Sequence, residues 1–148
     1  MRFFLCSVLF LTFGTIFTAQ AWELDDQAVK EHCAEEWSND FAMQKFCIDQ
    51  SVSGHREFSA KWSSEQDPVM LEAFDNCRHE WGIEWNMVSF CAEQQLSGRG
   101  KIPNTLSGLP DDASSAIRTH CESEWPADFA MTAYCVDRAA SAWRQINE

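Results

Sequence analysis

Six cysteines at a fixed spacing constrain the fold of this 148-residue chain more than any other feature. The cysteines of each pair are 14 positions apart, and each pair begins 44 positions after the previous one. The pairs are Cys33 and Cys47, Cys77 and Cys91, and Cys121 and Cys135. Because a fixed period of this length is typical of repeat architectures, the chain is predicted to contain three copies of one unit.

Residues around the cysteines follow the same period. Each unit has a Glu-Trp pair, and the tryptophan is the first of three repeated aromatic residues. It is followed in order by an acidic residue, a second aromatic residue, a methionine and a third aromatic residue. The aromatic and methionine positions are Trp37, Trp81 and Trp125; Phe41, Trp85 and Phe129; Met43, Met87 and Met131; and Phe46, Phe90 and Tyr134. We expect this stripe to form the core of each unit rather than a ligand groove, because apolar residues at helical spacing pack inward.

The cysteine spacing also predicts a chain reversal inside each unit. One continuous helix would hold the paired cysteines about 21 Å apart, whereas a disulfide needs Cα atoms about 4.4–6.8 Å apart. The reversal is expected where Ser38, Gly82 and Pro126 align. A new helix is expected to start there, since proline is tolerated in the first helical turn and disfavoured in the helix interior. Six cysteines allow fifteen pairings, and the common period favours one disulfide within each unit over metal ligation.

The predicted fold is therefore all-α, with three tandem helical hairpins that are each closed by a disulfide. The hairpins are expected at residues 22–54, 67–98 and 111–148, separated by linkers at 55–66 and 99–110. The acid at position 40, 84 or 128 is expected in the first turn of each second helix, where the helix dipole favours negative charge.

Predicted helix ends come from capping residues. Asp25, Asp67 and the pair 111–112 are expected to cap the first helix of each unit. Gly54 and Gly98, each seven positions after a second cysteine, are expected to end the second helices. Ala142 occupies that place in the third unit, so its second helix is expected to continue.

The amino-terminal segment 1–21 resembles a secretory signal. Arg2 is followed by an apolar run from Phe3 to Phe17 and then by Ala19-Gln20-Ala21, a small-x-small cleavage pattern. The run is shorter than the roughly 20 residues of a transmembrane helix. The sequence therefore predicts a chain that starts at Trp22, has no stable membrane anchor after cleavage, and is periplasmic or secreted, where disulfides persist.

The charge of the chain restricts its partners. The formal net charge is −12 at pH 7, with 11 basic and 23 acidic residues. Removal of the predicted signal takes away Arg2 alone and makes the charge −13. So negative a surface repels nucleic acid and anionic lipid. We expect a protein partner, and a cationic protein is compatible with this charge.

Reaction motifs do not occur in the sequence. It contains no Cys-x2-Cys zinc pair, no EF-hand spacing and no phosphate-loop or dinucleotide fingerprint. We therefore expect no cofactor, no metal and no catalysis, and predict a binding or interaction protein. Two alternatives remain open: an enzyme or enzyme inhibitor that uses a cleft between units near His79 or His120, and a calcium-dependent assembly protein.

Aromatic residues outside the repeated pattern are candidates for a contact site. Phe58 and Trp62 lie in the first predicted linker, close to the basic Arg56. An exposed tryptophan is a frequent anchor in protein interfaces, so these three residues are the predicted partner-binding site. The alternative is that the two aromatic residues fill the gap between neighbouring hairpins.

Overall fold

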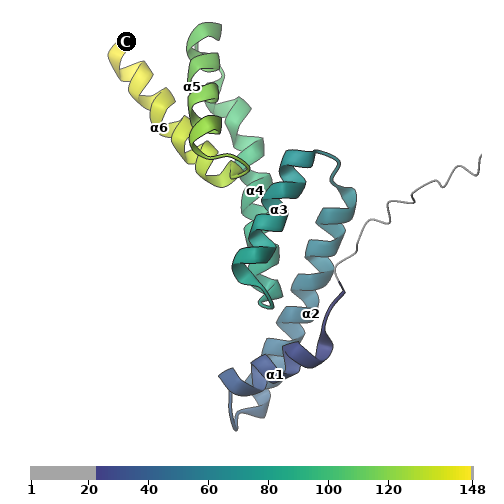
Figure 1. Ribbon diagram of the computed structural model, residues 1–148. Helices are drawn as coiled ribbons and strands as arrows, with labels where there is room; N and C mark the ends of the chain where they lie inside the picture. The colour runs from purple at the N-terminus through teal and green to yellow at the C-terminus, as the bar shows by residue number, and fades with distance from the viewer. Residues whose placement is uncertain (1–22, 148) are drawn as a thin grey trace, which may run out of the picture.

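The computed structural model describes residues 23–147, so the predicted signal segment 1–21 and the predicted first mature residue Trp22 lie outside the described residues. Within the described range the chain forms six α-helices and no strand (Figure 1). They are α1 (Asp26–Glu36), α2 (Phe41–Ser64), α3 (Pro68–Trp81), α4 (Trp85–Leu106), α5 (Asp111–Glu124) and α6 (Phe129–Asn147). The predicted all-α class is confirmed.

Each consecutive pair of helices is a hairpin closed by one disulfide. The Cα atoms of Cys33 and Cys47 are 5.8 Å apart, and those of the other two bridged pairs are 5.7 Å apart. The predicted pairing within hairpins is confirmed. A bridge that closes a loop of about 15 residues removes roughly 3 kcal/mol of unfolded-state entropy, which matters because a unit of about 40 residues buries too little apolar surface to fold reliably alone.

The chain reverses where the sequence predicts, but the second helices begin three residues later than expected. Asp40 and Asp128 immediately precede α2 and α6, where their carboxylates accept backbone hydrogen bonds from Met43 and Met131 at 3.0 Å. These acids therefore cap the helices from outside instead of belonging to the first turn. The capping contact still satisfies a backbone N–H at the positive end of the helix.

Two of the three predicted caps of the first helices are confirmed. Asp25 accepts a hydrogen bond from Ala28 N at 2.9 Å, and Asp67 accepts one from Val69 N at 3.0 Å. The prediction for residues 111–112 was wrong, because Pro110 is the capping residue and both aspartates lie inside the first turn of α5. There they still lie at the positive end of the helix dipole.

The prediction that Gly54 and Gly98 end their helices was wrong. Both residues are buried inside long helices, so residues 55–64 of the first predicted linker and residues 99–106 of the second are helical. A Cβ atom on Gly54 would lie 2.4 Å from the carbonyl oxygen of Trp85, and one on Gly98 would lie 2.3 Å from that of Phe129. These glycines permit a close helix crossing, because any side chain would collide with backbone.

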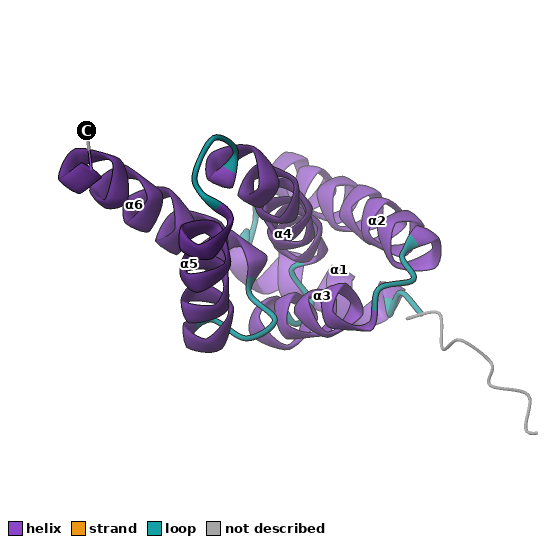
Figure 2. Ribbon diagram, turned by 90° about the horizontal axis from the view of Figure 1, so that it is seen from above, coloured by secondary structure: helices purple, strands orange, loops and turns teal. Residues whose placement is uncertain are grey.

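The second helices of the hairpins form the spine of the molecule. Helix α4 contacts α2 and α6 as well as its own hairpin partner α3. Figure 2 shows α4 between α2 and α6, with α1, α3 and α5 along the other side of the array. Each glycine crossing joins one spine helix to the start of the next, so the hairpins pack through their second helices.

The expected aromatic core is present only in part. Trp85 is buried, but its counterpart Phe41 is 78% exposed because no hairpin precedes α1 and α2 in residues 23–147 to cover it. The aromatic residues that precede the second cysteines are also exposed: Phe46 by 56%, Phe90 by 57% and Tyr134 by 56%. Since neighbouring helical residues point about 100° apart, a cysteine directed at its hairpin partner turns the preceding side chain towards solvent.

Candidate functional site

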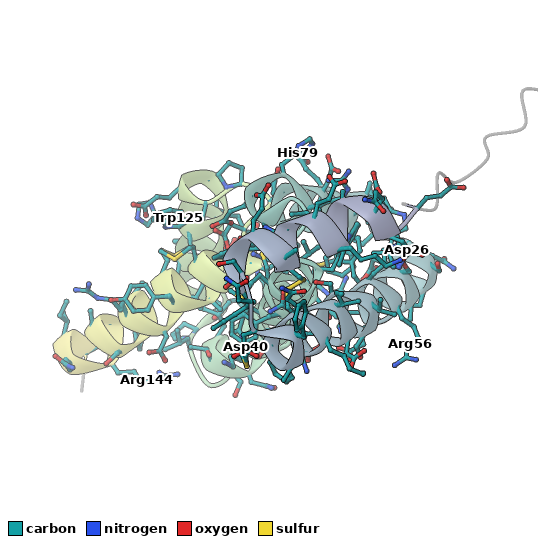
Figure 3. All side chains as sticks on the ribbon, turned by 90° about the horizontal axis from the view of Figure 1, so that it is seen from below. Asp26, Asp40, Arg56, His79, Trp125 and Arg144 are labelled. Atoms are coloured by element: carbon teal, nitrogen blue, oxygen red, sulfur yellow. A yellow bond between two sulfur atoms is a disulfide. The ribbon has the colours of Figure 1, made fainter. Side chains whose placement is uncertain are left out.

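The predicted contact residues lie in two different environments. Phe58 is fully buried, with ring centroids 5.9 Å from Trp62, 6.0 Å from Phe74 and 5.9 Å from Trp85. Trp62 is partly buried against the same cluster. Arg56 is exposed and projects from α2 (Figure 3). The two aromatic residues thus fill the gap between hairpins, and Phe58 offers no surface to a partner.

A groove lies on the surface between α2 and α4. Its volume is about 270 Å³ and its walls include Gly54, Lys61, Ser89, Phe90 and Glu93. At Gly54 the backbones of α2 and α4 lie against each other. We call this space the first groove.

A second groove lies between α4 and α6. It measures about 380 Å³, and its walls include Gly98, Lys101, Thr105, Tyr134 and Asp137. The glycine, the exposed aromatic residue and the acid each lie 44 positions after a residue of the first groove. The two spaces are therefore equivalent surfaces at successive junctions between hairpins.

Each groove presents an exposed aromatic ring followed three positions later by an acid. The pairs are Phe90 with Glu93 and Tyr134 with Asp137. Residues three positions apart share one face of a helix, so ring and carboxylate lie next to each other. Phe46 and Asp49 form a third such pair on α2. We refer to these as the aromatic–acid pairs; sequence reasoning placed their rings in the core and missed this surface.

Polar contacts differ between the grooves. In the first groove Lys61 Nζ lies 3.6 Å from Glu93 Oε2 and donates a hydrogen bond to Ser89 Oγ at 3.4 Å. Ser89 in turn donates to Glu57 Oε2 at 3.3 Å. In the second groove Ala133 stands at the position of Ser89. The serine and its hydrogen bonds therefore occur in the first groove but not in the second, whereas both grooves contain an aromatic–acid pair.

At one aromatic–acid pair a cation of the chain lies over the ring, whereas at the other two a lysine contacts the acid: Lys45 contacts Asp49 and Lys61 contacts Glu93. The guanidinium carbon of Arg138 lies 5.9 Å from the ring centroid of Tyr134. Glutamines, Gln50 and Gln94, stand at the equivalent positions beside Phe46 and Phe90. The arrangement at Tyr134 shows that a guanidinium fits over the ring of such a pair, and a phenylalanine ring accepts the same cation–π contact.

The histidines considered for the enzyme alternative lie at the surface. His79 Nε2 is 3.3 Å from Asp75 Oδ2, and His120 Nε2 is 3.6 Å from Glu124 Oε2. His120 and Glu124 also lie close to Cys135 Sγ, within 4.8 Å of one another. Cys135 is bonded to Cys121, so it has no thiolate to offer a metal.

A partly buried ion pair stabilises the end of α2 and lies outside the grooves. Arg99 Nη2 donates to Glu65 Oε2 at 2.8 Å, and the backbone N–H of Asp67 donates to Glu65 Oε1 at 3.0 Å. The hydrogen bond from Arg99, followed by that from Asp67, holds the pKa of Glu65 below its ordinary value of 4.5. This shift reflects a structural contact that joins α2 to α4.

Comparison with protein-family models, with curated proteins and with solved structures found no match for this chain. The fold and its bridges define a class: an all-helical, disulfide-stapled protein. Three intrachain disulfides point to a non-cytoplasmic, oxidising environment. In residues 23–147 none of the helices combines the length and apolar character that crossing a membrane requires.

Proposed function

We propose that this protein is a non-catalytic binding module of the periplasm or extracellular space, and that its partner is a basic segment of another protein. The observation that carries the proposal is the exposed aromatic ring with an acid three positions later, present at both grooves. A ring and a carboxylate side by side complement a lysine or arginine side chain through cation–π and charge-assisted contacts.

The overall charge supports the same class of partner. A net charge of −12 attracts a basic segment over long range and raises its association rate. Charge alone does not select a surface, however. The exposed rings of Phe46 and Phe90 supply apolar contact area, and aromatic residues including phenylalanine are enriched in the cores of interfaces.

A labelled peptide tests the proposal directly. We expect the protein to bind a 12-residue peptide of alternating lysine and serine in a fluorescence anisotropy titration, and to show no binding to the matching glutamate–serine peptide. Binding of the basic peptide is expected to weaken as salt is raised, because exposed charges are screened.

One substitution separates the aromatic surface from simple charge attraction. Phe90→Ser keeps the net charge and is expected to weaken binding about tenfold, corresponding to about 1.4 kcal/mol. Val52→Ser is the matched control, since Val52 is exposed on α2 outside the groove walls. Equal affinities of Phe90→Ser and the unchanged protein would mean that charge alone attracts the peptide, and the proposed site would be rejected.

A further inference from the structure

A third cavity, the junction cleft, lies between α3 and the turn that joins α5 to α6. It measures about 410 Å³, and its walls include Val69, Glu72, Glu122, Trp125 and Phe129. The aromatic and valine side chains provide an apolar surface, and the two glutamates are exposed. Figure 3 shows Trp125 at the edge of the array, on the hairpin that carries α5 and α6.

The junction cleft is negatively charged. Asp67 and Asp128 complete a set of four carboxylate side chains, and the wall residues include no lysine or arginine. Asp67 and Asp128 are partly used as helix caps, since they accept hydrogen bonds from Val69 N and Met131 N. Two of the carboxylates also lie near cations of the chain: Glu122 Oε1 is 3.5 Å from Arg118 Nη1, and Asp67 Oδ2 is 3.6 Å from Arg99 Nη1. At the exposed rim a ligand therefore meets Glu72 directly and has to displace Arg118 to pair with Glu122.

At the junction between the first and second hairpins, an arginine of the chain itself lies at the position equivalent to the junction cleft. Trp81 and Trp85 lie 44 positions before Trp125 and Phe129, and Arg78 lies 44 positions before Glu122. The guanidinium carbon of Arg78 is 5.7 Å from the ring centroid of Trp85. In the third hairpin Glu122 replaces this arginine, so the aromatic surface remains while an acid takes the place of the cation. This acid forms an exposed ion pair with Arg118, one helical turn away.

We propose that the junction cleft binds an arginine side chain of the partner, in the place that Arg78 occupies at the first junction. The guanidinium stacks on Trp125 or Phe129 and pairs with Glu72, or with Glu122 in place of Arg118. Arginine suits this cleft better than lysine, because its planar group stacks on rings and bonds carboxylates in a bidentate way. The source of the arginine rests on the proposed function, whereas the chemistry of the cleft does not.

The site is tested with a small probe on the whole ¹⁵N-labelled protein. N-acetyl-arginine-methylamide is titrated while the indole N–H resonance of Trp125 is followed by NMR. We expect a saturable shift with this probe, a smaller one with the lysine analogue, and none with the neutral citrulline analogue at the same concentration. An equal shift with citrulline, or no saturable shift with arginine, would overturn the proposal.

A substitution that copies the first junction provides the sharper test. Glu122→Arg places the chain's own guanidinium in the cleft and is expected to abolish the probe shift, while Glu122→Gln is expected to weaken it several-fold. Glu35→Arg on α1 makes the same change of charge far along the chain from the cleft and serves as the control. Retention of the full probe shift in Glu122→Arg would show that the cleft is not the site.

Failure of the two proposals is distinguishable. Phe90→Ser lies in the first groove and is expected to leave the probe shift at Trp125 unchanged. A protein that binds the arginine probe but not the lysine–serine peptide would uphold the junction cleft and reject the grooves. The reverse result would uphold the grooves and reject the cleft.

Discussion

The two junctions between hairpins use the same backbone crossing but surround it with different chemistry. Gly54 lies against the backbone at Trp85, and Gly98 lies against the backbone at Phe129. The first crossing is packed with aromatic rings around Phe58, whereas the second is packed mainly with aliphatic side chains. The glycine therefore sets how closely the helices approach, and the neighbouring residues decide which surface results.

The polar contacts also differ between the two junctions. At the first junction the ion pair of Glu65 and Arg99 joins the end of α2 to α4. The residues 44 positions later are Leu109 and Trp143, which belong to or pack against the second apolar cluster. At the second junction the buried Gln95 instead accepts a hydrogen bond from Phe129 N at 2.7 Å and so caps α6. The same helix crossing is thus stabilised by an ion pair at the first junction and by apolar packing with a glutamine cap at the second.

The largest expected effect is loss of the aromatic packing at the first junction. Phe58→Ala is expected to lower the free energy of unfolding by about 4 kcal/mol, because it empties a fully buried site between three rings. Ile102→Ala, at the equivalent buried position, is expected to cost about 3 kcal/mol. Urea denaturation measures both, and the reverse order would show that the aliphatic junction is the stronger one.

Substitution of the crossing glycines should affect both junctions alike. Gly54→Ala and Gly98→Ala are each expected to destabilise the protein by about 2–3 kcal/mol, because the new methyl group meets backbone that cannot rotate away. Gly100→Ala is the control within α4: nothing lies within 4 Å of its added methyl group. That change is expected to be stabilising by about 0.5–1 kcal/mol. A neutral result at Gly54 or Gly98 would contradict the close crossing.

The ion pair at the first junction is expected to make a pH-dependent contribution to stability. The pKa of Glu65 is lowered by Arg99, so its stabilising contribution is present above the unfolded-state pKa and is lost as the pH falls through the folded-state pKa. Glu65→Gln is expected to cost about 1–2 kcal/mol at pH 7 and to approach the stability of the unchanged protein in acid. Unfolding by urea at several pH values measures this; Glu31→Gln, on the exposed face of α1, is the control.

The smallest expected effect concerns the rings of the aromatic–acid pairs. Phe90→Ser and Tyr134→Ser should each change the free energy of unfolding by less than about 0.5 kcal/mol, because both side chains are more than half exposed. Thermal and urea unfolding provide the measurement. A loss of several kcal/mol would instead return these rings to the hairpin core, where the sequence pattern had placed them.

The hairpins could be predicted because their evidence is local. The distance between Cys33 and Cys47 along a helix is incompatible with a bond, so the chain had to reverse. Asp25 and Asp67 act on backbone groups only two or three positions away, and both were predicted as caps. The role of Gly54 was not predictable in the same way, since a helix end and a helix crossing both favour a residue without a side chain.

By itself, the sequence determined the number of hairpins, their disulfide pairing and their turns, because covalent spacing and helical rise act within one unit. Only the tertiary structure decided which members of the aromatic stripe are buried. Phe41 and Trp85 occupy the same place in their units, yet Trp85 is covered by α2 while Phe41 meets solvent. Whether a side chain is buried depends on which hairpin packs against it. The repeated pattern within one unit does not contain that information.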